Sequence, residues 1–468
     1  GNMLSSLPYK NMGIAGRLTY SFDDRYFIEG NVGYNGSENF SPGKRFGVFP
    51  AFALGWMVSN EKFFQPVTHI IDMLKLKGSY GIVGNDQIGG GRRFIYEATI
   101  QYKDANGNNL PGYTWGSTGN MGGNGIRMGE VANPNVGWEE AKKLNVGFEI
   151  SFFNAVKIQG DYFKEERSGI FMQRSALPGI VGLSTMPWVN VGKMNNQGFD
   201  GTIEYEQQIG EVQLTARGNF TYARSEIIDN DEPDWKHKYQ NRIGKPYGQS
   251  FGLKALGLFQ SQEEIDNSPT QTYGTVRVGD IKYQDIDGDG KIDANDEVAI
   301  GYPSLPEINY GFGATAAWKG FDLNVFFQGV SHTSFFIGGD AMYGFSSGNL
   351  GRAAINEDVY KHRWTAENPN PNARYPRMSA DNSPNNNRNS TWRMRDGSFL
   401  RLKNMEIGYS MPKRILDKTF ITSLRFYVSG QNLLTFSKFK LWDPELYSSN
   451  GAKYPISRVF TVGVNINL

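Results

Sequence analysis

Polar and hydrophobic residues alternate along much of this chain, and the alternation is clearest in its last eleven residues, Arg458 to Leu468. Because successive side chains of a strand point to opposite faces, this stretch predicts a strand with one apolar and one polar face. A soluble sandwich would bury the apolar face against a second sheet. An outer-membrane barrel would instead turn it to lipid, which ~9–11 residues suffice to cross. The apolar set is Phe460, Val462, Val464, Ile466 and Leu468, and the other set is Thr461, Gly463, Asn465 and Asn467.

The same alternation recurs from the first residues onward and predicts about thirteen antiparallel strands. In one of them, residues 399–411, the apolar positions change from even to odd numbers after Leu402, which predicts a β-bulge near Lys403. The predicted strands are residues 14–22, 26–34, 46–58, 74–82, 144–152, 156–162, 199–205, 212–222, 310–318, 321–327, 399–411, 424–428 and 458–468. A short helix is also compatible with the sequence around Val67 to Met73.

The connections between these strands fall into two classes that alternate without exception. The short connections are residues 23–24, 59–73, 153–154, 209–210, 319–320 and 412–420. The long ones are residues 35–45, 84–139, 167–197, 224–307, 331–397 and 432–456. Outer-membrane barrels have short periplasmic turns and long extracellular loops, whereas a soluble sandwich has no reason to keep this order. The fold class that we predict is therefore all-β, an antiparallel transmembrane β-barrel with long extracellular loops.

The predicted number of strands is odd, whereas single-chain bacterial barrels have an even number of strands and both ends in the periplasm. We expect the chain to begin within an extracellular loop, at Gly1 to Gly13, and to be the C-terminal piece of a longer polypeptide. The alternative is that separate genes encode the two parts of the barrel. The first residues also lack the basic and apolar regions of a signal peptide, which fits either a missing beginning or a chain that is not exported.

Composition narrows the choice of protein class. No apolar run approaches the ~18 residues of a membrane-spanning helix, which excludes a helical membrane protein. Aromatic residues make up 14% of the chain and glycines number 57, which suits aromatic girdles and curved strands. A net charge of +1 without a dense Lys/Arg block gives no reason to expect nucleic acid. The absence of cysteine removes disulfides, thiolate metal sites and thiol nucleophiles.

The most specific chemical motif is the acidic segment from Asp285 to Asp296, which reads DIDGDGKIDAND. It places carboxylates at positions 1, 3, 5, 9 and 12 of a twelve-residue loop and glycine at position 6, which is how an EF-hand-type loop surrounds Ca²⁺ with oxygen. Aspartate at position 12 shortens the usual glutamate arm, so we expect a weak site with a Kd of ~10⁻⁴–10⁻³ M. A solvated acidic turn is the alternative. The predicted ligands are Asp285, Asp287, Asp289, Asp293, Asp296 and the carbonyl of Lys291.

Other candidates for chemistry are weaker. The segment from Asp104 to Asn108 begins like a cation loop but reaches Trp115 at position 12, which favours a plain turn. No HExxH or GxSxG motif is present and the histidines lack ligand spacing, so we expect no enzyme activity. Aromatic residues in the long 331–397 connection could stack on sugars, although girdles and loop packing explain them equally well. The histidines are His69, His237, His332 and His362, and the loop aromatics are Tyr343, Trp364, Tyr375 and Trp392.

Seven segments in order resemble the SusC-like (SusC/RagA) branch of TonB-dependent outer-membrane transporters. They are FGVFPAFALGWMVSNEKFF from Phe46, LKLKGSYGIVGN from Leu74, NPNVGWEEAKKLNVGFE from Asn133, VNVGKMNNQGFDGTIEY from Val189, GDIKYQDIDGDGKIDANDE from Gly279, FLRLKNMEIGYSMPK from Phe399 and GQNLLTFSKFKLWDPE from Gly430. Together they span nearly the whole chain.

This resemblance implies a barrel of about 22 strands in the bacterial outer membrane, with its lumen plugged by an N-terminal domain. It also implies import of oligosaccharides or peptides with energy from the TonB complex, and a SusD-like surface lipoprotein as a lid. The chain departs from the family in lacking the plug, the TonB-interacting segment and the early strands, and it ends in Leu468 where many barrels end in Phe. We therefore expect residues 1–468 to be the C-terminal part of such a barrel. The alternative function is a scaffold or passive channel without active transport.

Overall fold

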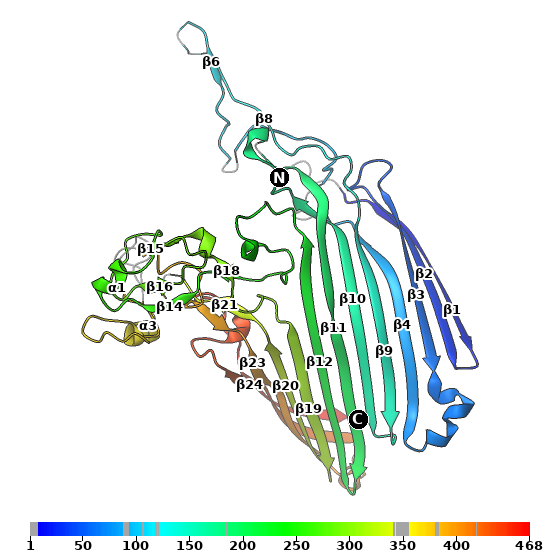
Figure 1. Cartoon of the computed structure of the whole chain (residues 1–468). Helices are drawn as coiled ribbons and strands as arrows, with labels where there is room; N and C mark the ends of the chain where they lie inside the picture. Colours follow the sequence, from blue (N-terminus) through cyan, green and yellow to red (C-terminus); the bar gives the residue numbers. More distant parts are fainter. Residues whose placement is uncertain are drawn as a thin grey trace.

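The fold was analysed in a computed structural model, which describes residues 8–87, 93–104, 107–117, 119, 121–183, 185–339, 342, 355–379, 383–417 and 419–468. Its main element is one thirteen-stranded antiparallel sheet in which each strand pairs with the next main strand along the chain (Figure 1). This confirms the predicted fold class and strand count. The strands are β1 (Asn11–Phe22), β2 (Tyr26–Ser37), β3 (Phe46–Met57), β4 (Ile71–Asn85), β9 (Glu139–Phe152), β10 (Val156–Gln173), β11 (Trp188–Ile209), β12 (Val212–Asp229), β19 (Ile308–Trp318), β20 (Phe321–Ser331), β23 (Phe399–Ser410), β24 (Ser423–Ser437) and β25 (Val459–Asn467).

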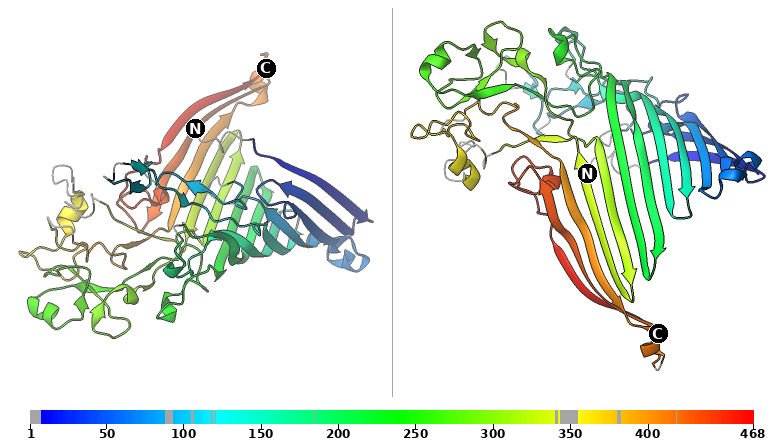
Figure 2. Two further views of the ribbon diagram at one scale, coloured as in Figure 1. Left: turned by 90° about the horizontal axis from the view of Figure 1, so that it is seen from above. Right: turned by 60° about the horizontal axis from the view of Figure 1, so that its bottom comes forward.

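The sheet curves into an open trough whose two edge strands, β1 and β25, lie apart from each other (Figure 2). The short turns lie together at one end of the strands and the long connections at the other (Figure 1). Two of the short turns use backbone in the left-handed region, with φ of 54° and 48° at Asp23 and Asp24 and of 53° and 50° at Phe153 and Asn154. Such turns match the twist of the flanking strands and keep the hairpins tight.

Cross-strand registers place the predicted apolar residues on one continuous face. Val146 lies opposite Gly78 and Tyr162, and the next pair along the sheet, Tyr162 and Phe199, has ring centroids 5.2 Å apart. The apolar residues stay largely exposed, for example Val462 at 80%. Among the described residues no second layer covers this face, which excludes the sandwich interpretation.

The predicted bulge is confirmed, because the register of β23 shifts between Leu402 and Asn404 against both of its neighbours. Two smaller predictions were wrong. The connection predicted at 167–197 is shorter, since β10 continues to Gln173 and β11 already begins at Trp188. These extensions do not continue the alternation of the predicted strands, since residues 164–169 of β10 are polar or glycine and the apolar Ile170, Phe171 and Met172 then follow one another directly. The helical turns fall at 58–67 and not around Val67 to Met73, whose last residues open β4.

The connections between β12 and β19 and between β20 and β23 fold into a compact body beside one end of the sheet, whereas the connection between β4 and β9 projects away from that body (Figure 1). The core of the compact body includes the fully buried Leu253, Ile281 and Ile292, drawn from separate segments. No described helix is long and apolar enough to cross a membrane. The remaining elements are β5 (Ile100–Gln101), β6 (Tyr113–Trp115), β7 (Met121–Gly123), β8 (Arg127–Met128), β13 (Phe251–Gly252), β14 (Ala255–Leu258), β15 (Thr270–Gln271), β16 (Ile281–Tyr283), β17 (Lys291–Ile292), β18 (Val298–Ala299), β21 (Ser334–Phe336), β22 (Met394–Asp396), α1 (Gln262–Asp266), α3 (Glu357–His362), α4 (Lys413–Leu416), and the 3₁₀ turns η2 (Val58–Asn60), η3 (Lys62–Val67), η4 (Gly179–Val181), η5 (Lys238–Gln240), η6 (Ala294–Asp296) and η7 (Pro444–Leu446).

Candidate functional site

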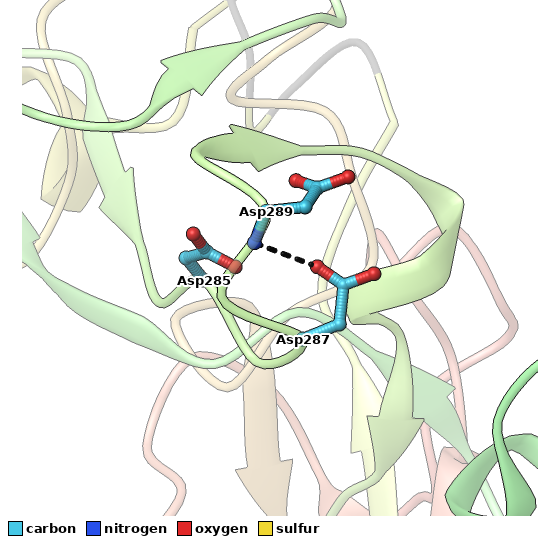
Figure 3. Close-up of side chains that lie close together, drawn as sticks. All are labelled: Asp285, Asp287 and Asp289. Carbon is cyan, nitrogen blue, oxygen red and sulfur yellow. Dashed lines mark hydrogen bonds between the residues drawn. The ribbon is translucent and has the colours of Figure 1, made fainter.

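The first half of the acidic segment forms a tight turn between β16 and β17, and its second half runs through β17 and η6. Asp285, Asp287 and Asp289 lie together on this turn (Figure 3), with one carboxylate oxygen of each within 4.8 Å of the others. Gly288 and Gly290 have φ of 75° and 82°, which lets the backbone double back here at little steric cost. The structure therefore brings together three of the predicted ligands through local sequence alone.

Hydrogen bonds within the turn already use part of the carboxylate capacity. The Gly288 and Gly290 amides donate to the two oxygens of Asp285 at 2.7 and 2.9 Å. The Asp289 amide donates to Asp287 Oδ1 at 3.3 Å (Figure 3), and Asp289 Oδ1 accepts from the Lys291 amide at 2.9 Å. Because a carboxylate oxygen has more than one lone pair, these bonds fix the turn while leaving acceptor capacity for a cation.

The other two predicted aspartates have a different task. Asp296 is almost fully buried, and its two oxygens accept from the amides of Ile286 and Asp293 at 2.7 and 2.8 Å. Asp293 in turn accepts from the Asn295 amide and caps η6. Within the described part of the chain, these two carboxylates lie outside the cluster of three. They close the turn by holding its second half against its first.

A lysine and a histidine from a distant segment approach the same turn. Lys236 Nζ lies 3.3 Å and His237 Nε2 3.1 Å from Asp287 Oδ2. Burial raises the pKa of Asp287, but the hydrogen bonds from Lys236 and the Asp289 amide outweigh burial and hold that pKa below its ordinary value. Sequence reasoning missed both partners, since His237 has no ligand spacing and about fifty residues separate them from Asp287.

Ion pairs line the face of the sheet opposite the apolar one. Lys77 Nζ lies 3.2 Å from Glu149 and 3.2 Å from Asp161, which joins β4, β9 and β10 across the polar face. Near the short-turn end, Arg425 on β24 pairs with Asp322 on β20 and Glu406 on β23. Sequence analysis predicted only that this face is polar. Charged residues at the positions that alternate with the apolar ones would have indicated the ion pairs.

Several weaker candidates are resolved by their surroundings. Trp364 and Tyr375 are buried in loop cores, which favours the loop-packing interpretation over sugar stacking, and Tyr343 lies outside the described residues. Asp104 accepts from the Asn108 amide at 2.8 Å in a plain turn whose middle residues are also outside the described range. Of the other histidines, His332 stacks on Tyr302 with ring centroids 4.4 Å apart, and His362 Nδ1 lies 2.9 Å from Asp358 Oδ1.

Comparison with known proteins covers nearly the entire chain. A family model described as TonB dependent receptor-like, beta-barrel matches residues 4–433. TonB-dependent receptor P3 of Formosa agariphila is 27% identical over 484 residues, covering 97% of this chain and 45% of the relative. TonB-dependent receptor SusC of Bacteroides thetaiotaomicron is 24% identical over 478 residues, covering 96% and 43%. The chain thus spans about half the length of the curated relatives it matches.

The fold has a matching solved structure. The RagAB peptide transporter superposes with a TM-score of 0.76 at 23% identity, and the match covers 98% of this chain and 48% of the solved one. At that identity the likeness concerns the fold alone. It agrees with the strand order and with the curvature of the sheet described above.

Proposed function

Because this chain belongs to the TonB-dependent receptor-like β-barrel family, in its SusC-like branch, we propose that it forms part of the wall of an importer for oligosaccharides or peptides. The chain is located in the bacterial outer membrane. The observation that carries the proposal is the division of one sheet into an uncovered apolar face and a polar face crossed by ion pairs such as Lys77–Asp161. That division suits a wall with lipid on one side and an aqueous lumen on the other.

Closing the barrel requires further strands. Strands β1 and β25 have one unpaired edge each, and backbone groups left unsatisfied in lipid cost several kcal/mol apiece. We therefore propose that residues 1–468 are the C-terminal part of the barrel. The remaining strands and an N-terminal plug would come from another part of the polypeptide or a second chain. The relatives, about twice as long as this chain, support this arrangement.

An importer of this kind also needs a source of energy and a cover for its extracellular end. The TonB complex would act through the N-terminal portion, and a SusD-like lipoprotein would cover the end that carries the long connections. Support for the lid comes from the compact loop body at that end, which offers a preformed surface outside the lipid-facing belt (Figure 1). Receptors and transporters of this kind perform no chemistry on their cargo, so we propose no enzyme activity.

The test is uptake by cells in which the gene for this chain is deleted or restored, with and without a working TonB complex. Fluorescent oligosaccharides and peptides of graded size serve as cargo. An importer should lose uptake on either deletion. Uptake that persists without TonB would favour a passive channel. Uptake that is unchanged when the gene for this chain is deleted would favour a scaffold.

We also propose that the acidic turn binds Ca²⁺. The carboxylates of Asp285, Asp287 and Asp289, which lie close together, support it. The Lys291 carbonyl and the carboxylates of Asp293 and Asp296 would join the oxygen shell only if the two aspartates gave up the amide hydrogen bonds that close the turn. Calorimetry with Ca²⁺ should give a Kd of ~10⁻⁴–10⁻³ M. Asp289→Asn should weaken that binding, while Asp266→Asn, an exposed change outside the turn, should leave it unchanged. No heat above buffer at millimolar Ca²⁺ would favour a plain acidic turn.

A further inference from the structure

A cavity of about 680 Å³ lies where the polar face of the sheet meets the long connections. Its floor is formed by the ends of β10, β11 and β12, where Arg167, Met194 and Ile227 take the positions that alternate with the apolar face. Its roof is the segment of residues 242–251, which we call the strap. The cavity therefore opens on the lumen side of the wall and not toward lipid.

Hydrogen bonds hold the strap on both sides of the cavity. On the wall side, the Gly244 amide donates to the Ile227 carbonyl at 2.8 Å and the Ile227 amide donates to the Lys245 carbonyl at 2.9 Å. On the other side, the Ser304 amide donates to the Gly248 carbonyl at 3.0 Å, and Gln249 Nε2 donates to the Ile300 carbonyl at 2.9 Å. Anchoring at both ends makes this a preformed site, which lowers the entropic cost of binding a ligand.

The lining carries more positive than negative charge. Arg242 and Lys245 of the strap line the cavity, and within the described part of the chain neither has an ion-pair partner. Lys193 also borders the cavity, but its neighbours Gly192 and Met194 take the lumen-side positions of β11, so its side chain lies on the opposite face. The third cation on this side, Arg167, is already paired with Glu139 and Glu165, with contacts of 2.6 and 2.7 Å.

Two carboxylates belong to the lining. Glu139 is engaged by Arg167, and Asp229 accepts from the Asp231 amide at 3.1 Å. Asp229 lies opposite Lys193 in the strand register, on the outward face, so Arg242 and Lys245 remain at the cavity as two cations without an ion-pair partner. A negatively charged ligand would neutralise the unpaired cations of the cavity.

The rest of the lining is apolar. Ile170, Met172, Met194 and Ile227 form its floor, and the Arg242 guanidinium lies 5.3 Å from the ring centroid of Phe251. Gly192 keeps this floor open, because a Cβ there would lie only 2.9 Å from Ile170 Cβ. A site that combines cations with an apolar floor selects ligands with both an acidic group and an apolar surface.

We propose that this cavity binds carboxylate-bearing oligomers, and that these are the preferred cargo of the importer. The inference rests on the proposed import function, which it deepens by naming the substrate class. An acidic peptide and a uronate oligosaccharide both present the required carboxylates, and either fits a volume of this size. Lys245 and Arg242 would pair with those carboxylates at the lumen entrance.

The experiment measures binding to the protein purified from outer membranes in detergent, together with the chains that accompany it. The probes are pentaglutamate against pentaglutamine, and tetragalacturonate against maltotetraose. We expect the acidic member of at least one pair to bind more tightly, with a preference that weakens as salt rises. Arg242→Gln combined with Lys245→Gln should raise its Kd between about twofold and thirtyfold. The matched control is Lys238→Gln with Lys254→Gln, two exposed lysines outside the cavity, and it should leave the Kd unchanged.

Each outcome has a defined meaning. Preference for one acidic probe alone identifies peptide or glycan as the source, and preference for both supports the shared carboxylate chemistry. Equal binding of acidic and neutral probes, or an equal effect of the control pair, overturns the inference. Uptake of neutral and acidic cargo at the same TonB-dependent rate would also overturn it while leaving the import function intact. Selective binding without any TonB-dependent uptake would overturn the import function alone.

Discussion

Placing a positive charge at Val146 tests the orientation of the whole sheet. Val146 lies near the middle of β9, a strand of 14 residues, which exceeds the ~9–11 needed to cross the hydrocarbon region. Its side chain is 52% exposed on the apolar face. Val146→Arg therefore puts a guanidinium close to the bilayer midplane, at a cost of ~2–4 kcal/mol. That corresponds to about a thirtyfold to eight-hundredfold change in the folding equilibrium.

The neighbouring residue supplies the control. Asn145 lies opposite Ser79 and Phe163 on the polar face, so Asn145→Arg should cost less than about 1 kcal/mol. Both variants would be made in the complete barrel, with the strands that pair with β1 and β25, then refolded into lipid vesicles and unfolded with urea, with the folded fraction followed by tryptophan fluorescence and heat-modifiable migration on gels. Equal destabilisation by the two substitutions, or a larger effect at Asn145, would refute the assignment of faces.

Three further predictions concern other parts of the molecule. Chelation of divalent cations should increase protease cleavage within residues 224–307 while leaving the sheet folded, because a loop site couples mainly to its own loop. Arg425→Ala should destabilise the barrel by about 1 kcal/mol more than Arg425→Lys in urea unfolding, since it leaves Asp322 without its partner. Burial raises the pKa of Asp358, but hydrogen bonds from Tyr375 and Arg374 hold it below its ordinary value. Its stabilising contribution is therefore complete above about pH 4 and is lost as pH falls through the depressed value, so proteolysis near α3 should increase there in the wild type but not in Asp358→Asn.

The sequence was sufficient for the sheet wherever lipid imposes a contrast between the two faces. Apolar residues such as Val146, Phe199 and Val462 each belong to a strand in which every second residue is apolar, because one face of the sheet meets hydrocarbon and the other meets water. The contrast disappears beyond the membrane, and the ends of β10 and β11 were missed for that reason. The bulge near Lys403 was predictable because a one-residue shift moves every apolar side chain to the other face unless an extra residue restores the register.

The candidate sites differ in the same way: those built from neighbouring residues could be predicted from the sequence, and those built from distant segments could not. Asp285, Asp287 and Asp289 were found because the spacing within one turn brings their carboxylates together. Lys236 and His237 were not found, since only the folding of the loop body sets their distance from Asp287. The cavity was missed for the same reason, because its floor and strap come from four separate segments of the chain.

The segment just before the strap contacts the acidic turn, and the strap itself covers the cavity. The hydrogen bonds that fix the strap therefore determine how strongly a change at the turn reaches the cavity. Lys236 and His237 hold the segment just before the strap to Asp287, whereas Glu232 accepts from the amides of Arg242 and Ile243 at 3.0–3.1 Å. A cation that takes over Asp287 competes with the first contact only, because Glu232 and the pairing of the strap with the wall at Ile227 are independent of it. Ca²⁺ should therefore change protease access around residues 232–238 while leaving the Kd for an acidic probe within about twofold. A larger change in that Kd on chelation would show that Asp287 controls the cavity through the strap.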